Sequence, residues 1–258
     1  MADSGNQSRR GFLSRATAVG STMLLAGCYD LSQKPWVLSI LGEVENLTRK
    51  AQRLFAGSHA LAPEFSKADI APSFRANGTL NPGTADYQAH VANAFRDWRV
   101  RVGGLVEHPL SLSLSDLRSL PSRTQITRHD CVEGWSCIGE WTGVQLSRVL
   151  AMAGVKPAAR YVMFHCADAM GEGDDTLYYE SLDLLEATHP QTLLAYELNG
   201  APLPVQNGAP VRLRAERQLG YKMAKYIERI ELVDDFRQVR GGKGGYWEDQ
   251  GYAWYAGI

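Results

Sequence analysis

The sequence has no excess of charge of either sign, because 27 Lys and Arg residues are balanced by 28 Asp and Glu residues. Nucleic-acid binding depends on clustered excess Lys and Arg, so the composition gives no reason to expect a nucleic-acid partner. The chain also lacks an internal repeat and an apolar run of the roughly 18 residues that a membrane-spanning helix needs. With 258 residues, 45% of them hydrophobic, it is long enough for one globular domain with a substantial core.

The N-terminus predicts an export signal. Arg9 and Arg10 precede a short, weakly apolar segment over 16–27, which has the layout of a secretory signal with a twin-arginine start. The segment runs into "LAGC", which resembles a bacterial lipoprotein cleavage box that ends at the acylated Cys28. We therefore expect residues 1–27 to be removed, Cys28 to carry a lipid anchor, and the mature protein to be periplasmic. The twin-arginine signal resembles that of proteins exported already folded, commonly with a cofactor inside. This favours a redox cofactor.

Cysteine is scarce, with four residues in the whole chain. If Cys28 is acylated, the mature protein keeps Cys131, Cys137 and Cys166 in a compartment where disulfides are permitted. Three is an odd number. At least one thiol is therefore unpaired, and an unpaired thiol in the periplasm needs a chemical explanation.

Local patterns predict the order of helices and strands. Apolar residues at helical spacing predict an amphipathic helix over 35–55. The segment 57–86 is rich in Pro, Gly, Asn and Ser and reads as irregular. Beyond it we expect strands within 98–117, 124–130, 160–166, 210–215 and 225–233, helices over 142–154 and 181–187 with caps at Thr142 and Ser181, and a hairpin turning at Asn199-Gly200.

Strands and short helices alternate without a regular βαβ rhythm, which favours a single α+β domain with mixed β-sheets over a doubly wound sheet. We divide the chain into a signal segment over 1–27, an N-terminal helix and irregular segment over 28–97, and a core over 98–235. A tail rich in Gly and aromatic residues follows over 236–258. This tail is expected to cover a site, to contact a partner or simply to pack on the surface.

The stretch "RHDCVEGWSC", residues 128–137, leaves four roles open for Cys131. Cys131 and Cys137 are close enough in sequence for a disulfide. Together with His129, His165 and Cys166 they offer enough ligands for zinc, although the spacings match no common zinc motif. A nucleophile with His129 as its base is also compatible with strand geometry. The fourth role is a thiolate ligand to a soft or high-valent metal that an organic cofactor holds.

A second stretch, from Leu203 to Lys225, has the composition of a cofactor cradle. The amides of Gln206 and Asn207 can donate to and accept from the edge of a heterocycle, and glycines allow backbone N–H groups to approach an anion. Arg212 and Lys225 supply cations for a phosphate or pyrophosphate. This second stretch favours the cofactor role for Cys131.

Three motifs, "CVEGWS", "HPQTLLAYELNGAPLPVQNGAPVRL" and "GYKMAKYIERIEL", closely resemble the molybdopterin-binding domain of the sulfite oxidase fold family. The resemblance covers roughly 98–233. Within this family, the sequence is similar in particular to periplasmic catalytic subunits of bacterial methionine sulfoxide reductases and to sulfite-oxidase-like bacterial relatives. The resemblance implies a mixed α+β fold around a mononuclear molybdenum held by a pyranopterin.

The resemblance also implies roles for particular residues. Cys131 would be the thiolate ligand of molybdenum. Cys166 falls where the reductase has a threonine near the cofactor, and we expect it to line the pocket. His129, which can titrate near neutrality, is the candidate proton-transfer group, with His165 as a second candidate. The expected contacts to the pterin and its phosphate are Asn77, Asn207, Arg212, Met223, Ala224 and Lys225.

The cofactor supplies two-electron, oxygen-atom-transfer chemistry, while the pocket chooses the substrate. Sulfite oxidases of animals and plants place several arginines around the metal, whereas Val132 and Glu133 follow the cysteine here. An acidic residue is a poor neighbour for the sulfite dianion. Reduction of S-oxides or N-oxides is therefore favoured, although Arg128 and Arg217 keep sulfite oxidation open as an alternative, and a cofactor-free binding lipoprotein of the same fold is another.

The sequence contains no C-x-x-C-H haem motif, so electron transfer requires a separate protein. The resemblance suggests a membrane cytochrome of b type as that partner. A lipid on Cys28 would hold the enzyme beside it.

Overall fold

The computed structural model describes residues 34–57, 60–171, 173 and 176–258. The predicted signal segment and Cys28 lie outside these residues. The chain divides into two units, 1–55 and 56–258, and each is described by itself.

In the described part of the N-terminal unit lies the long helix α2 (Pro35–Ala56), which confirms the helix expected over 35–55. Pro35 occupies its first turn, where a missing N–H costs nothing, and Arg53 lies in its last turn, where a cation offsets the partial negative charge of the helix end. No helix in the described part of the chain is long and apolar enough to span a membrane.

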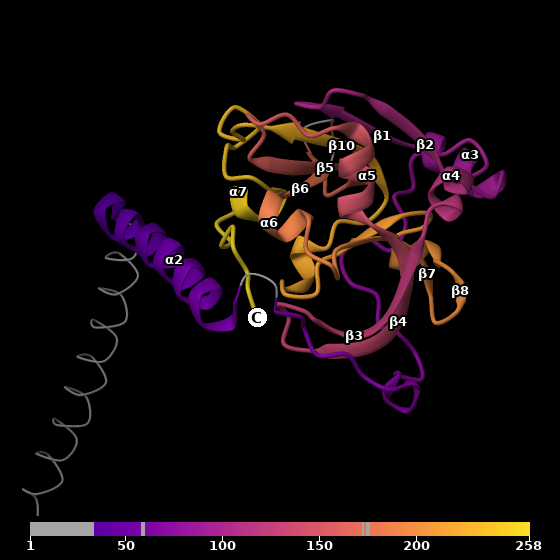
Figure 1. Ribbon diagram of the computed structural model, residues 1–258, viewed down its shortest axis with the longest axis horizontal. Coiled ribbons are helices and arrows are strands. Elements are labelled where there is room, and N and C mark those ends of the chain that lie inside the picture. Colours follow the sequence, from indigo (N-terminus) through magenta and orange to yellow (C-terminus); the bar gives the residue numbers. More distant parts are fainter. Residues whose placement is uncertain (1–33, 58–59, 172, 174–175) are drawn as a thin grey trace, which may run out of the picture. The chain divides into compact units, whose positions relative to one another are not determined.

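The C-terminal unit is built on two β-sheets (Figure 1). In the first sheet, β1 and β10 pair in parallel and every other neighbouring pair is antiparallel. Its strand order is β2 (Leu110–Ser113), β1 (Arg99–Gly104), β10 (Ile227–Val233), β5 (Tyr161–Ala169) and β6 (Leu177–Asp183).

The second sheet is antiparallel throughout. It runs β3 (Ser122–Asp130), β4 (Ser136–Gln145), β7 (Leu193–Leu198) and β8 (Ala201–Pro202), and β9 (Arg212–Arg214) also pairs with β7.

Short helices connect and cover these sheets. The α-helices are α3 (Ala85–Ala92), α4 (Leu114–Ser119), α5 (Leu146–Ala153), α6 (Leu184–Ala187) and α7 (Tyr246–Asp249), and the 3₁₀ turns are η1 (Lys67–Asp69), η3 (Val205–Asn207) and η4 (Gly220–Lys222).

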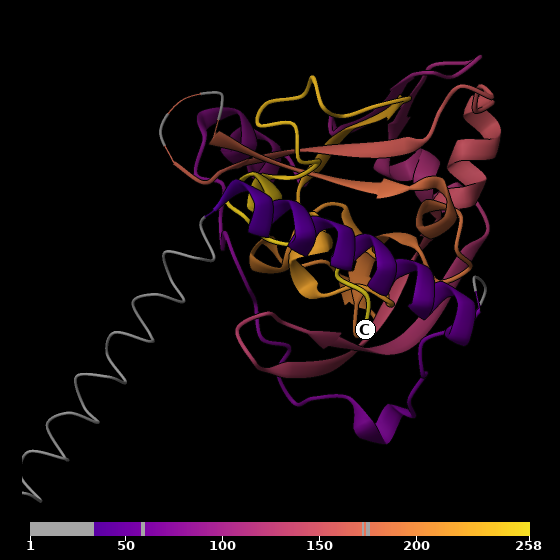
Figure 2. The ribbon, with the colours of Figure 1, turned by 90° about the vertical axis from the view of Figure 1, so that its left-hand side faces the viewer.

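The main core follows from alternation along the strands. In β1, Val100 and Val102 point inward while their neighbours Arg99 and Arg101 are exposed, as a half-buried strand requires. The inward residues meet the apolar face of α5 in one buried cluster. In Figures 1 and 2 the sheet of β3 and β4 lies below that of β5 and β6, and the orange segment that follows β8 runs between them. The candidate cradle is thus enclosed by both sheets.

The predicted hairpin is confirmed. Leu198 pairs with Ala201, and the intervening Asn199 and Gly200 have φ of 53° and 75°. Both angles are left-handed, as a two-residue turn between antiparallel strands prefers.

Two predicted helix starts are wrong. The segment 142–145 is the end of β4, so α5 begins at Leu146, and Thr142 pairs with Thr124 across the strands. Ser181 lies inside β6, and Asp183 caps α6 instead. In each case pairing with neighbouring strands outweighs a local capping pattern, because a strand position satisfies backbone groups that a cap leaves unpaired.

Candidate active site

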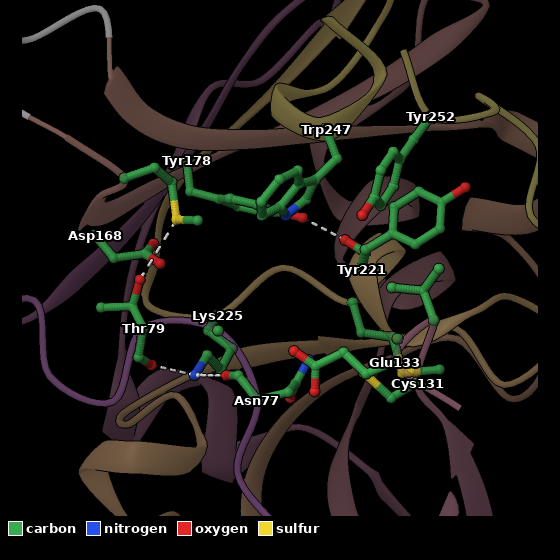
Figure 3. A pocket seen from close by; sticks show the side chains of 15 residues that line it. Asn77, Thr79, Cys131, Glu133, Asp168, Tyr178, Tyr221, Lys225, Trp247 and Tyr252 are labelled. Atoms are coloured by element: carbon green, nitrogen blue, oxygen red, sulfur yellow. Dashed lines mark hydrogen bonds between the residues drawn. The ribbon is translucent and has the colours of Figure 1, made fainter. Parts of the chain in front are cut away.

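Figure 3 shows a cavity that is open to solvent at its mouth. Its volume is about 140 Å³. Six segments form it: the irregular segment before α3, the turn after β3, the end of β5, the start of β6, the loop around η4, and the C-terminal segment. Its polar, sulfur-bearing and aromatic lining includes Asn77, Thr79, Cys131, Glu133, Asp168, Tyr178, Tyr221, Met223, Lys225, Trp247 and Tyr252.

A tight turn after β3 presents Cys131 to this cavity. The Cys131 N–H donates to the Trp135 carbonyl at 2.9 Å, and the Gly134 N–H donates to the Cys131 carbonyl at 3.0 Å. Gly134 has a φ of 84°, which glycine adopts without strain. The side chain of Cys131 is buried and free of any disulfide, so the disulfide alternative is wrong.

Burial raises the pKa of the Cys131 thiol, and the backbone N–H of Glu133 partly opposes this shift by hydrogen bonding. The thiol is therefore a weak nucleophile at neutral pH unless a cation binds it, and a metal that coordinates the sulfur removes its proton. The described residues contain no group of three or more His, Cys, Asp or Glu side chains placed to hold a metal ion. The five ligands considered for zinc are thus not brought together.

His129 lies behind the cavity wall. It is fully buried, and its Nδ1 lies 3.0 Å from Nη1 of Arg214. Because a guanidinium can only donate, Nδ1 is the acceptor and the proton of the neutral ring sits on Nε2. Nε2 packs against Gly220, where an added Cβ would come within 2.4 Å of it.

The expected titration of His129 near neutrality is wrong. Burial, reinforced by Arg214 and Arg212, lowers its pKa well below the usual value, because both effects disfavour a second positive charge. His165 also lies away from the cavity. It contacts Glu231, and burial together with Arg229 lowers its pKa to about 4. A catalytic role for His129 stays a prediction, and its contact with Arg214 suggests a positioning role.

Two buried cations lie beside and beneath the cavity. Arg212 donates from Nη1 to the Asn207 carbonyl at 3.0 Å and from Nη2 to the Met223 carbonyl at 3.4 Å. Lys225 donates from Nζ to the carbonyls of Asn77, at 2.7 Å, and Thr79. Within the described residues, neither cation forms a salt bridge with a carboxylate.

Both cations are therefore under strong electrostatic stress. Burial, aided by Arg214, lowers the pKa of Arg212 to about 9, and burial, aided by Arg212, lowers that of Lys225 to about 7. A bound anion would relieve both, because it would supply the missing negative charge.

Unpartnered polar atoms mark the same place. Nδ2 of Asn207, Nε of Arg212 and Oδ1 of Asn77 are buried and have no hydrogen-bond partner among the described residues. Gly208 packs closely against both cations, since an added Cβ would stand 3.0 Å from the Lys225 side chain and 3.1 Å from that of Arg212. Buried donors and acceptors without partners cost free energy unless a ligand supplies the partners. The side chains present therefore fit a phosphate-bearing heterocycle.

Most of the predicted site residues gather here, but at two depths. Asn77, Cys131, Met223 and Lys225 line the cavity. Behind this layer lie Asn207, Arg212 and Ala224, all buried.

Cys166 is placed differently from the prediction. Cys166 lies opposite Ile227 in the sheet. Its side chain belongs to the hydrophobic core and does not line the cavity. Burial raises the pKa of this thiol well above its usual value. The expectation of a pocket-lining thiol is wrong, because the inward face of β5 packs against the apolar core.

Sequence reasoning missed two sets of cavity residues. Asp168 follows β5's apolar run, and burial raises its pKa to about 6 although Thr79 and Lys225 oppose the shift. A charged residue inside "FHCADAM" was the available signal. The signal for the aromatic residues was weaker, because a large aromatic side chain usually belongs to the core. These residues are Tyr178, Tyr221, Trp247 and Tyr252.

The comparison with protein-family models decides the family. Residues 88–239 match the model described as the oxidoreductase molybdopterin binding domain. The chain belongs to this molybdopterin oxidoreductase family. It is accordingly an oxidoreductase with a molybdopterin cofactor, and the predicted sulfite oxidase-type α+β fold is confirmed.

Named relatives in the family include sulfoxide reductases. The protein-methionine-sulfoxide reductase subunit YedZ1 of Azospira oryzae, a name given provisionally, is 36% identical over 96% of this chain and 87% of its own. The protein-methionine-sulfoxide reductase catalytic subunits MsrP of Xanthomonas axonopodis and Campylobacter jejuni are 43% and 36% identical. They match over 53% and 54% of this chain and 45% and 50% of their own lengths, so the chain spans about half of these MsrP relatives.

Among solved structures, the sulfane dehydrogenase SoxCD of Paracoccus pantotrophus aligns with 54% of this chain and 39% of its own. The sequence identity is 27% and the TM-score is 0.49.

Proposed function

We propose that this molybdopterin oxidoreductase reduces S-oxides in the periplasm, with methionine sulfoxide, free or within a protein, as the substrate class. The observation that carries the proposal is that a free Cys131 thiol lines the same cavity as Lys225, with Arg212 buried behind it, and that burial lowers the pKa of both cations. The names of the sulfoxide reductase relatives support the choice of substrate class.

The chain's own residues would hold the cofactor. Cys131 would provide the thiolate ligand to molybdenum. Arg212 and Lys225 would bind the phosphate of the cofactor, whose negative charge would offset theirs. The free amide atoms of Asn77 and Asn207 bond the polar parts of the pterin. When bound, the cofactor supplies two-electron oxygen-atom-transfer chemistry.

The charges of the cavity favour neutral substrates. Glu133 lines it, and this acidic side chain disfavours an anion such as sulfite. Arg128 and Arg217, the residues that kept sulfite oxidation open, line a different cavity together. Arg75 does affect the Cys131 thiol, but it stacks on the ring of Trp135 at 4.7 Å. Reduction of a neutral S-oxide fits this arrangement better than oxidation of sulfite.

Reducing an S-oxide to a sulfide and water consumes two electrons and two protons. Asp168 is the buried acid on the cavity wall whose pKa, about 6, allows its carboxyl to hold a proton near neutral pH. Asp168 is therefore our candidate proton source. Its Oδ1 has no partner within the described residues, so it is free to donate to a ligand.

Electrons would come from a membrane cytochrome of b type. The sequence itself has no C-x-x-C-H haem motif, so a separate donor is required. The twin-arginine segment and the lipoprotein-type Cys28 support a periplasmic, membrane-anchored location beside that donor.

The test is to purify the holoenzyme from its native membrane and measure molybdenum, extractable pterin and turnover. Methionine sulfoxide, dimethyl sulfoxide, trimethylamine N-oxide and sulfite would be assayed with artificial electron carriers. We expect metal and pterin in near equal amounts and the highest kcat/KM with an S-oxide. Sulfite turnover that exceeds S-oxide turnover would overturn the substrate assignment, and a folded protein without pterin would favour the binding-lipoprotein alternative.

A further inference from the structure

The C-terminal segment 236–258 supplies one wall of the cavity (Figure 3). Trp247 of α7 and Tyr252 just beyond it both line the space. Their rings stack with centroids 5.3 Å apart and planes 22° apart, and Tyr252 meets Tyr221 edge-on at 5.2 Å. An aromatic surface thus covers the side of the cavity away from Cys131.

This wall is anchored at several points. Glu248, between the two wall residues, forms a buried ion pair with Lys222, which also binds Glu180. The Tyr221 hydroxyl donates to the Ala253 carbonyl at 2.7 Å, and the Leu219 N–H donates to the Ala256 carbonyl at 2.9 Å. The rings are therefore held in place before any ligand enters, which reduces the entropy lost on binding.

The opposite wall is the turn that carries Cys131, Val132 and Glu133. In Figure 3, Cys131 and Glu133 lie across the open space from Trp247 and Tyr252. Val132 is 48% exposed, so this turn also offers an apolar side chain. A small molecule whose reacting oxygen lies near Cys131 therefore projects its remaining atoms toward the aromatic rings.

Aromatic rings of this kind prefer apolar and sulfur-containing groups to anions. Alkyl chains gain contact area on such a wall, and a thioether-type sulfur interacts favourably with ring edges. The acidic side chain of Glu133 acts against negatively charged groups in the same space. The cavity thus selects by shape and charge together.

We propose that Trp247 and Tyr252 form a substrate subsite that binds the alkyl arm of a neutral S-oxide, such as the side chain of a methionine sulfoxide residue. The proposal rests on the proposed function and names the residues that set its specificity. A substrate with an arm uses the subsite, whereas dimethyl sulfoxide, which has two methyl groups, is too small to reach it.

The experiment compares Trp247→Ala and Tyr252→Ala with the wild-type holoenzyme on two sulfoxides, N-acetylmethionine sulfoxide amide and dimethyl sulfoxide. We expect each variant to raise KM for the longer sulfoxide about tenfold, with KM for dimethyl sulfoxide within about twofold of wild type and kcat little changed. Calorimetric titration of the oxidised enzyme with the longer sulfoxide, without electron donor, should show the same loss of affinity.

The matched control is Trp254→Ala. Trp254 lies in the same segment, but it packs against Tyr161 and Phe236 and does not line the cavity. It should leave the ratio of the two KM values unchanged. Molybdenum content and Tm are measured on every variant, and Tyr252→Ala, at a more exposed position, carries the test should Trp247→Ala fail to fold.

The outcomes separate the two proposals. A wild type that reduces neither sulfoxide would overturn the proposed function. A wild type that reduces both, with an unchanged KM ratio and unchanged calorimetric affinity in the loaded variants, would overturn the subsite alone. An equal shift in Trp254→Ala would also overturn it, because the effect would then come from loosening the segment.

Discussion

Lys222 and Lys225 lie three residues apart on one loop and are both buried, but their surroundings differ. Lys222 forms ion pairs with Glu180 and Glu248, and these partners raise its pKa in spite of burial. Lys225 donates only to carbonyl oxygens, and burial together with the neighbouring charge of Arg212 lowers its pKa to about 7, although Asp168 opposes the shift. Burial is common to both, so the neighbouring charges decide the outcome.

The difference separates a structural cation from a binding cation. A buried charge that the protein itself neutralises fastens two parts of the chain together, here β6 and the C-terminal segment. A buried charge left without a counterion costs free energy in the empty protein and is useful only when a ligand brings the opposite charge. Arg212 belongs with Lys225 in this second class.

The largest expected effect concerns the sulfur on the binding side. Cys131→Ser should abolish turnover while leaving Tm of the cofactor-free protein little changed, because the thiol makes no disulfide and serine has a similar size. Steady-state assays and thermal unfolding measure the two quantities. Wild-type turnover in this variant would rule out the ligand assignment.

Next in size is the structural cation. Lys222→Met leaves Glu180 and Glu248 buried without their cation and should lower the free energy of unfolding by about 3–5 kcal/mol, a typical cost of breaking a buried pair. Chemical denaturation of the cofactor-free protein measures it. A loss below about 1 kcal/mol, the size expected for a surface pair, would show that the two lysines do not differ in this way.

The same substitution at the binding cation should act in the opposite direction. Lys225→Met should leave the cofactor-free protein as stable as wild type or more so, because it removes an unpaired buried charge. Its affinity for the cofactor should fall about tenfold or more, the worth of a hydrogen bond to a charged group. Molybdenum and pterin content at limiting cofactor supply reports the affinity. Full occupancy would contradict the phosphate role.

The smallest effect is a pH dependence. The folded-state pKa of Lys225, about 7, is below its usual value of 10.5, so its unfavourable charge is fully present below pH 7 and is relieved as pH rises. Wild-type, cofactor-free protein should gain stability relative to Lys225→Met between pH 7 and pH 8.5, by at most about 1.4 kcal/mol per pH unit. Parallel denaturation curves measure the difference. A difference independent of pH would mean that Lys225 stays charged throughout.

Much of the site was readable in the sequence because its parts are local. The amides and cations of the cradle lie within one stretch, Leu203 to Lys225, and Cys131 lies in one turn with its own glycine. The hairpin at Asn199-Gly200 was likewise fixed by two adjacent residues that tolerate positive φ. Residue type and short spacing suffice for such features.

Other features were beyond sequence patterns because they depend on distant partners. Thr142 belongs to strand β4 and not to the predicted capping box, because β3 and β7 pair with β4 on its two sides. From the sequence, the C-terminal aromatic residues could equally form a surface tail. In the structure, the ion pairs of Lys222 with Glu180 and Glu248 hold this segment against β6.

The cofactor class could be predicted from the sequence through the family resemblance of its motifs, and the thiolate, amide and guanidinium groups agree with it because their donor and acceptor capacity is the same wherever they lie. Only the tertiary structure decided which groups are charged and which surfaces are exposed. It made His129 neutral beside Arg214, turned Cys166 into the core, and brought Trp247 to the cavity. The physical reason is that desolvation and Coulomb interactions depend on distances in space, which sequence separation does not give.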